Sequence, residues 1–545
     1  MKAKYLLIFC LLFITKNYAQ QQNNIQKPKL VVGIVVDQMR YDYLTRFWER
    51  FEENGFKRLV SEGYNFKNHH FNYVPTYTGP GHASVWTGTT PMNHGIIGNN
   101  WFDKVKGESV YCTDDASVTP IGTNSDAGKM SPVLLKTTTI ADQNRLHTQM
   151  KGKTIGVALK DRGSILPAGH TANAAYWFSG GKEGRFITSS FYRDDLPKWI
   201  RDFNDSGKVK SYLKEWNTLY DIETYTESGI DENNFEAGFK GKEKATFPYN
   251  LKALSSKNGN FGIISATPFG NDLTTDFALA AIKGEKLGED EITDFLTLSF
   301  SSTDYVGHNF GVNSKEIEDT YLRLDKNIAE ILNFLDKNIG KGAYTIFLTA
   351  DHGAVNVPSY LQSVKIPGGY FNDLKFTQAL KKHVFSEFGK DNLIQNVSNG
   401  QVFFNYKKLK EANISSEELQ NSVALFCIQQ EQIDKVITRK QLLGANFSSG
   451  IRELIQNGFN QKRSGDVVFV LNPATIVYPK TGSTHGSGLT YDTHAPLIFF
   501  GAGVKQGNTT ERSEIPDIAP TVASILGIAF PNGTSGRPLH KMLDQ

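Results

Sequence analysis

Short, almost purely apolar stretches that are each followed by a charged residue constrain the fold of this 545-residue chain more than any other feature. The clearest is 29–36, a β-branched run that ends at Asp37. Such runs are typical of strands buried on both faces of a parallel sheet. The pattern returns at 154–159 before Lys160, at 295–300 before Asp304 and at 344–348 before Asp351. The sequence therefore predicts several parallel strands with charged side chains at their carboxyl ends.

Helical patterns lie between these strands. In 313–335, apolar residues recur every three or four positions, and Asn313 with Glu316 is expected to cap the start. Alternating strands and helices predict an α/β fold with a central, mostly parallel sheet flanked by helices. Ligands of such sheets bind outside the carboxyl ends of the strands, so the chemistry is expected there.

Two regions interrupt the alternation, 171–258 and 356–479. We interpret both as insertions that form a smaller cap lobe over the mouth of the site. The core pattern resumes at 491–504, and 515–528 predicts a final helix. Residues 20–545 are thus interpreted as one catalytic domain that carries this lobe.

Residues 1–19 have the organisation of a secretory signal peptide. Lys2 and Lys4 precede a short apolar run, and Ala19 stands at the cleavage position. That run is too short to span a bilayer, and no later stretch is long and apolar enough. The sequence predicts an exported, periplasmic protein without stable membrane insertion.

The mature chain has no excess charge. Cleavage removes Lys2, Lys4 and Lys16 from 59 basic residues, and the remaining 56 equal the 56 acidic residues. A neutral chain gives no bulk electrostatic reason to expect a nucleic-acid partner. Only Cys112 and Cys427 remain, too few for a thiolate metal site, and they are expected either as one disulfide or as two buried thiols.

The stretch 74–86 centres on Thr78. Pro75, Gly79, Pro80 and Gly81 are expected to form a turn, and the residues after them favour a helix, so Thr78 is predicted at or just before a helix N-terminus. Unpaired backbone N–H groups there can bind a phosphate or sulfate. The alternative is that Thr78 only caps the helix.

Carboxylates and imidazoles recur at the predicted strand ends. Each is unremarkable alone, since an Asp after a strand commonly caps a helix or a turn. Together, without a thiolate, they suit zinc with open coordination positions, or another divalent ion such as manganese. Two metals about 4 Å apart need about six or seven ligands, which this set provides. It comprises Asp37, Thr78, Asp304, His308, Asp351, His352 and His485.

These motifs resemble the alkaline phosphatase superfamily, in particular the Thr-nucleophile phosphate monoesterases of bacterial periplasms, and also the nucleotide pyrophosphatase/phosphodiesterases. The likeness extends from Asp37 to the segment 517–527. It implies an alkaline-phosphatase-like sandwich fold and two Zn²⁺ ions. One zinc is assigned to Asp37, Thr78, Asp351 and His352, and the other to Asp304, His308 and His485. Asn99 matches the family residue that hydrogen-bonds a nonbridging phosphoryl oxygen, with its neighbour Asn100 as the alternative.

Related enzyme classes fit the sequence less well. Sulfatases that use formylglycine carry Cys or Ser as the nucleophile and Arg four residues later, where this chain has Thr78 and His82. Phosphoethanolamine transferases resemble the same core but usually carry a membrane-spanning region.

Lys160 and Arg162 follow a predicted strand and favour a monoesterase. A monoester phosphate is a dianion that benefits from fixed cations, whereas a diester needs room for a second substituent. Arg binds two oxygens through its planar fork. The pair also resembles the Lys and Arg that distinguish the monoesterase branch. The alternative is a solvated loop with two basic residues.

The resulting hypothesis is hydrolysis of small-molecule phosphate monoesters by a monomeric enzyme. Thr78, activated by zinc, attacks phosphorus, and water then hydrolyses the phosphothreonine intermediate. One alternative is a phosphodiesterase or nucleotide pyrophosphatase on the same two-metal site. Another is an exported phosphate- or glycan-binding protein without turnover. No role is assigned to His82, His94, His170 or His494.

Overall fold

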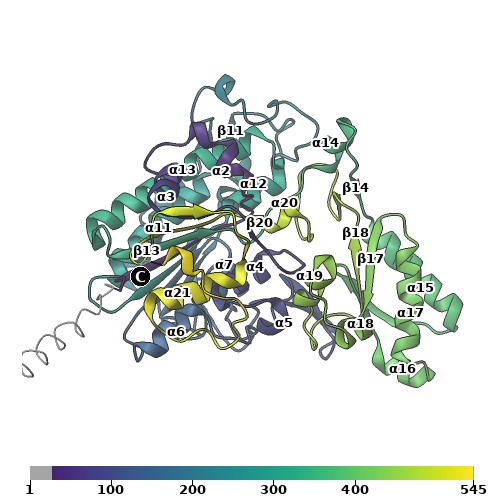
Figure 1. The fold of residues 1–545 in the computed structure, drawn as a ribbon. Coiled ribbons are helices and arrows are strands. Elements are labelled where there is room, and N and C mark those ends of the chain that lie inside the picture. Colours follow the sequence, from purple (N-terminus) through teal and green to yellow (C-terminus); the bar gives the residue numbers. More distant parts are fainter. Residues whose placement is uncertain (1–26, 544–545) are drawn as a thin grey trace, which may run out of the picture.

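The computed structural model describes residues 27–543 (Figure 1). The predicted signal peptide, 1–19, lies outside the described residues. A ten-stranded sheet has the order β22-β2-β21-β13-β1-β12-β7-β8-β9-β6. In that order the strands span Gly507–Thr509, Tyr64–Phe66, Leu497–Gly501, Tyr344–Thr349, Leu30–Val36, Asp294–Phe300, Thr154–Ala158, Ala174–Ser179, Arg185–Ser189 and Pro120–Ile121.

The centre of this sheet is parallel, as predicted. β1 pairs in parallel with β12 and β13, and β12 pairs in parallel with β7. Val36 lies opposite Phe300, and Val35 lies opposite Thr349. The segments that follow these strands therefore leave the sheet at one edge, which confirms the predicted α/β fold and brings their charged residues together.

Helices flank the sheet (Figure 1). One group contains α11 (Phe269–Glu285), α12 (Ser302–Phe310) and α13 (Lys315–Leu335), and another contains α4 (Thr78–Thr87), α7 (Asp161–Ala168) and α21 (Ile518–Leu526). The expected cap of α13 was wrong: Ser314 accepts the N–H of Ile317, whereas the Asn313 side chain donates to Asn356.

The region 171–258 differs from the expected inserted lobe. Its first strands, β8 and β9, belong to the ten-stranded sheet, and β8 pairs in parallel with β7. Further along, the Trp216 indole N–H donates to Asp319 on α13 at 2.8 Å. This region therefore packs on the body of the protein. Its mixed aromatic and charged composition hid two strands that lie towards one side of the sheet.

The region 372–471, which we call the lobe, contains a second sheet of order β15-β16-β18-β17. These strands span Ile394–Ser398, Gln401–Phe404, Val467–Leu471 and Ile433–Thr438. The lobe has its own apolar core, to which α15 (Asp373–Phe388) and α17 (Ser416–Ile428) contribute, and it projects to the right in Figure 1. Its role as a cap stays a prediction.

Cys112 and Cys427 are both buried free thiols, which decides between the two expected states of these cysteines. Cys427 belongs to the core of the lobe, and Cys112 to a small apolar cluster in the body. None of the helices within 27–543 combines the length and apolar character needed to cross a membrane.

Candidate active site

Thr78 is the first residue of α4, as predicted, and is almost fully buried. Its Oγ1 lies 3.4 Å from Nε2 of His352. Next to it, the Gly79 N–H donates to Oδ1 of Asn99 at 2.7 Å. Because this bond uses the amide oxygen of Asn99, its N–H groups stay available to donate to an anion beside Thr78.

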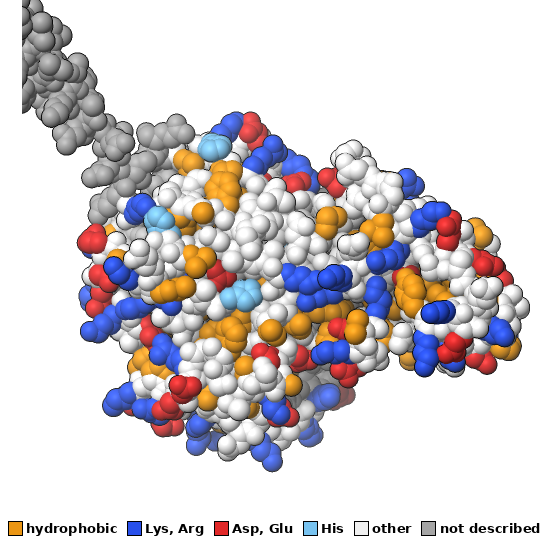
Figure 2. Space-filling model, turned by 90° about the horizontal axis from the view of Figure 1, so that it is seen from below, with side chains coloured by type: hydrophobic (Ala, Val, Ile, Leu, Met, Phe, Trp, Pro, Cys, Tyr) orange, Lys and Arg blue, Asp and Glu red, His pale blue; other side chains and the backbone are white. Residues whose placement is uncertain are grey.

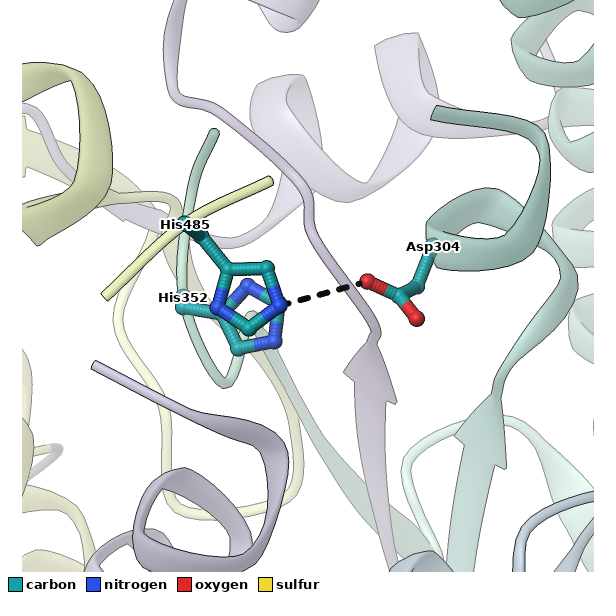
Figure 3. Close-up of side chains that lie close together, drawn as sticks. All are labelled: Asp304, His352 and His485. Atoms are coloured by element: carbon teal, nitrogen blue, oxygen red, sulfur yellow. Dashed lines mark ion pairs between the residues drawn. The ribbon is translucent and has the colours of Figure 1, made fainter. Parts of the chain in front are cut away.

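The predicted metal ligands come together at the carboxyl edge of the sheet. Ligand atoms of Asp304, His352 and His485 lie within 4.8 Å of one another (Figure 3), and so do those of Asp37, Asp351 and His352. The rings of His352 and His485 stack with their centroids 3.4 Å apart.

His308 joins the first of these groups. It lies one helical turn after Asp304 on α12, and its Nε2 is 3.1 Å from Asp304 Oδ1. Residues from three strand-end segments and the His485 loop thus form one cluster.

Lys160 lies between the two groups. Its Nζ is 2.6 Å from Asp37 Oδ2 and 2.5 Å from Asp304 Oδ2. The other oxygen of each carboxylate faces an imidazole, since Asp37 Oδ1 is 3.4 Å from His352 Nε2. Lys160 was expected to face phosphate, whereas the structure shows it bridging two carboxylates through their Oδ2 atoms.

The pKa values reflect this crowding. Burial, with repulsion from Asp351 and Asp304, raises the pKa of Asp37 well above its usual range. Burial opposes ionisation of Asp304 too, but His308 and Lys160 hold its pKa well below the usual range. Burial, and then His352, lower the pKa of His485, which favours the neutral imidazole that metals bind.

The donor set fits divalent cations. Asp37 Oδ1 and Asp351 Oδ2 are buried and accept no hydrogen bond from any described residue. Buried carboxylate oxygens are normally paired with a donor or a metal. Carboxylates and neutral imidazoles without thiolate are donors that zinc accepts.

Arg162 is held by one edge of its guanidinium. Nη1 donates to the Tyr111 hydroxyl at 2.9 Å, and that hydroxyl donates to Asp161 Oδ1 at 2.5 Å. Arg162 Nε is buried and has no acceptor among the described residues. The Nε edge is therefore available for the two-point contact that Arg makes with a phosphate.

The comparison with known families agrees with this geometry. A family model described as type I phosphodiesterase / nucleotide pyrophosphatase matches residues 31–495. The chain belongs to this family. The match covers both candidate metal groups, Thr78, Lys160 and Arg162.

Relatives in the type I phosphodiesterase family carry differing names. The chain is 46% identical to a "calcium-transporting ATPase" of Myroides odoratus, with 96% of each chain covered. It is 44% identical to alkaline phosphatase PafA of Elizabethkingia meningoseptica, again with 96% of each covered. Alkaline phosphatase PhoV of Synechococcus elongatus is 45% identical, with 95% of this chain and 94% of the relative covered.

Solved structures also match this chain in fold. Wild-type PafA matches with a TM-score of 0.91 and 44% identity, over 95% of this chain and 99% of that one. Murine ectonucleotide pyrophosphatase/phosphodiesterase 5 matches in fold, with a TM-score of 0.54 and 13% identity over 95% of this chain and all of that one. These findings confirm the predicted superfamily and an enzyme of the alkaline phosphatase type.

Two residues that contact the candidate ligands were not assigned a role from the sequence. Gln38 Nε2 donates to Asp304 Oδ1 at 2.7 Å, and the Gln38 backbone N–H donates to Asp351 Oδ1. His82 Nδ1 lies 3.2 Å from Asp351 Oδ2. Only their positions in the sequence could have indicated this role, because Gln38 follows Asp37 and His82 is one helical turn after Thr78.

The other unassigned histidines make local contacts. His94 Nε2 lies 2.9 Å from Ser84 Oγ, His170 Nε2 lies 3.1 Å from the Leu135 carbonyl oxygen, and His494 Nε2 lies 3.0 Å from the Lys67 carbonyl oxygen. None of these contacts involves a candidate ligand.

Proposed function

We propose that the chain is an exported, zinc-dependent alkaline phosphatase that hydrolyses phosphate monoesters through a phosphothreonine intermediate on Thr78. The observation that carries this proposal is the position of the Thr78 hydroxyl. It lies at the start of a helix, against His352, which belongs to both carboxylate–imidazole groups. Relatives named alkaline phosphatases, at 44% and 45% identity, support the reaction class.

Two Zn²⁺ ions would be held by the two ligand groups. Asp37, Thr78, Asp351 and His352 would hold one ion, and Asp304, His308 and His485 the other. The chemistry that bound divalent cations supply is Lewis acidity, which favours ionised hydroxyl groups and offsets charge on phosphoryl and leaving oxygens.

The chain's own residues account for the remaining steps. Thr78 gives up its hydroxyl proton and its Oγ forms a bond to phosphorus, while the ester oxygen departs with the bonding electrons and takes up a proton. Water then attacks the phosphothreonine, the bond from phosphorus to Thr78 breaks, and inorganic phosphate is released. Asn99 and Arg162 would donate hydrogen bonds to the nonbridging oxygens, where such bonds stabilise developing charge.

The buried surroundings make these contacts stronger. Thr78, Asp37 and His352 are at most 1% exposed. Electrostatic interactions are stronger in such a setting than in water. The Nε edge of Arg162 suits the dianion of a monoester, because two of the nonbridging oxygens can accept hydrogen bonds from this edge.

The decisive experiment compares wild-type protein with Thr78→Ala during turnover of 4-nitrophenyl phosphate. Rapid acid quenching and peptide mass spectrometry should find phosphate on Thr78 in the wild type and none in the variant. Full turnover by Thr78→Ala would reject the nucleophile assignment. Metal analysis of the same samples measures the identity and number of bound ions.

A phosphodiesterase or nucleotide pyrophosphatase is the second candidate, because the matching family model carries that description. Rates on 4-nitrophenyl phosphate and bis(4-nitrophenyl) phosphate separate the two, and a preference for the monoester is expected. ATP belongs in the same substrate panel, because one relative is named an ATPase.

Export and a monomeric state are parts of the same proposal. Sequencing the N-terminus of the protein recovered from the periplasm should give Gln20 as the first residue. Light scattering should give the mass of a single chain.

A further inference from the structure

A cavity of about 470 Å³ lies between the candidate active site and the lobe. One wall contains Tyr77 and the segment 484–488, which carries His485. The opposite wall contains Phe371 and residues of β18 in the lobe. The cavity therefore begins beside Thr78 and a candidate metal ligand. In Figure 2 the lobe projects at the right, and hydrophobic side chains gather near its junction with the body.

Strand β18 gives the cavity an apolar wall. Successive side chains of a strand point to opposite faces of its sheet. Val467 and Phe469 belong to the core of the lobe, whereas Val468 and Val470 pack with a different cluster that contains Ile455. Val468, Val470 and Ile455 all line the cavity. Phe469 and Leu471 line the cavity as well, so β18 presents an apolar surface to it along most of its length.

The polar lining is almost uncharged. Among the described residues that line the cavity, Asp373 is the only one with a carboxylate, and none is lysine or arginine. Asn399, Gln401 and Asn472 offer amide groups. An anionic group entering here would lose water without gaining a cation, which is costly, whereas a neutral group with an apolar face would bury that face.

We propose that this cavity binds the alcohol part of the substrate, and that it selects uncharged alcohols with an aromatic or apolar face. This inference rests on the proposed monoesterase function. A phosphorus atom placed against Thr78 has its ester oxygen directed away from the attacking hydroxyl, because attack and departure are in line. The group on that oxygen then extends past the His485 loop. Apolar pockets with a few neutral polar groups are typical of small-molecule sites.

The test uses a matched pair of substrates, 4-carbamoylphenyl phosphate and 4-carboxyphenyl phosphate. They have nearly the same shape and differ in the charge of the leaving group. The test variant is Val470→Lys, which places a cation in the cavity. The control is Leu425→Lys on α17, where the side chain is 63% exposed and does not line the cavity.

The measured quantity is the ratio of kcat/KM for the amide to that for the carboxylate. Val470→Lys should lower this ratio by about tenfold, because the new cation attracts the carboxylate. Leu425→Lys should leave the ratio as in the wild type. An unchanged ratio in Val470→Lys would overturn the inference, whereas absence of monoester hydrolysis in the wild type would instead overturn the proposed function.

A second variant guards against misfolding of the first. Val470→Phe keeps the apolar character and fills space, so it should raise KM for both aryl esters several-fold. It should lower kcat/KM for methyl phosphate far less than for the aryl esters, because a methyl group does not reach the cavity. Binding of the product 4-hydroxybenzamide, measured by saturation-transfer NMR, should weaken in parallel. Equal losses for methyl and aryl esters would contradict the assignment.

Discussion

Replacing Tyr111 by Phe should weaken phosphate monoester hydrolysis, although Tyr111 is not a predicted ligand or nucleophile. Its hydroxyl accepts a hydrogen bond from Arg162 Nη1 at 2.9 Å and donates one to Asp161 at 2.5 Å. The substitution keeps the ring and removes only the oxygen. Arg162 would then lose the contact that fixes its orientation while keeping its charge.

The size of the effect follows from the kind of bond removed. A hydrogen bond to a charged group contributes about 1.5–3 kcal/mol. A free-energy loss of about 1.4 kcal/mol corresponds to a tenfold loss of rate. If the transition state loses the whole hydrogen-bond contribution, kcat/KM falls by about 10- to 150-fold. Asp161 keeps a contact from Thr113 at 3.3 Å, so part of the network survives. We therefore expect a loss near tenfold in kcat/KM.

The assay compares kcat/KM for an aryl monoester with that for the matching diester. Tyr111→Phe should affect the monoester much more, because Arg162 is proposed to contact the additional charged oxygen of the dianion. Tyr344→Phe is the matched control: it also removes a tyrosine–aspartate hydrogen bond, of 2.7 Å to Asp336, but at the amino end of β13. Equal losses for monoester and diester in Tyr111→Phe, or no loss at all, would refute the reasoning.

The remaining predictions concern charge in the buried site and near it. Lys160→Met should lower the free energy of unfolding of the chelated protein by about 3–5 kcal/mol, because it leaves Asp37 and Asp304 without their shared cation. Urea unfolding should show a smaller loss in zinc-loaded protein, and equal losses would contradict the bridging role. Chelation of wild-type protein should lower Tm and abolish hydrolysis, and added Zn²⁺ should restore both. Activity that survives complete metal removal, verified by elemental analysis, would argue against a metal-dependent site. Burial raises the pKa of Asp492 to about 7, so between about pH 4 and 7 the folded state holds a proton that the unfolded state has lost, and stability falls as pH rises. Asp492→Asn should therefore stabilise the protein more at pH 8 than at pH 5 in urea unfolding, and an equal effect at both would contradict this assignment.

The central strands could be predicted from the sequence because burial on both faces makes them mostly apolar. The expected strand 29–36 differs from β1 by one residue, and 344–348 differs from β13 by one. Strands β8 and β9 are also mostly buried, but they were missed because they lie in a region of mixed aromatic and charged composition. A nearly unbroken apolar run is thus what made the central strands recognisable.

The contacts of the Lys160 and Arg162 side chains could not be predicted in the same way. Lys160 was recognisable as a basic residue after a strand, but its bridging of two carboxylates depends on which strands are neighbours in the sheet. β7 lies next to β12, and β12 lies next to β1, so Lys160 reaches both Asp304 and Asp37. The hydroxyl of Tyr111 comes from another segment, and no local pattern connects it to Arg162.

The glycines after Thr78 were expected to form a turn, but the structure places them in a closely packed helix. Gly79 and Gly81 lie within α4, and Gly81 is needed for space: a Cβ atom there would lie 2.2 Å from the Asp351 carbonyl oxygen. At the sheet, a Cβ atom on Gly33 would lie 2.4 Å from the ring of Trp86, near the other end of α4. The helix is therefore in close contact with the sheet and with the Asp351 segment at two points. The absence of side chains at Gly33 and Gly81 allows this close packing. The packing in turn places the Thr78 hydroxyl against His352.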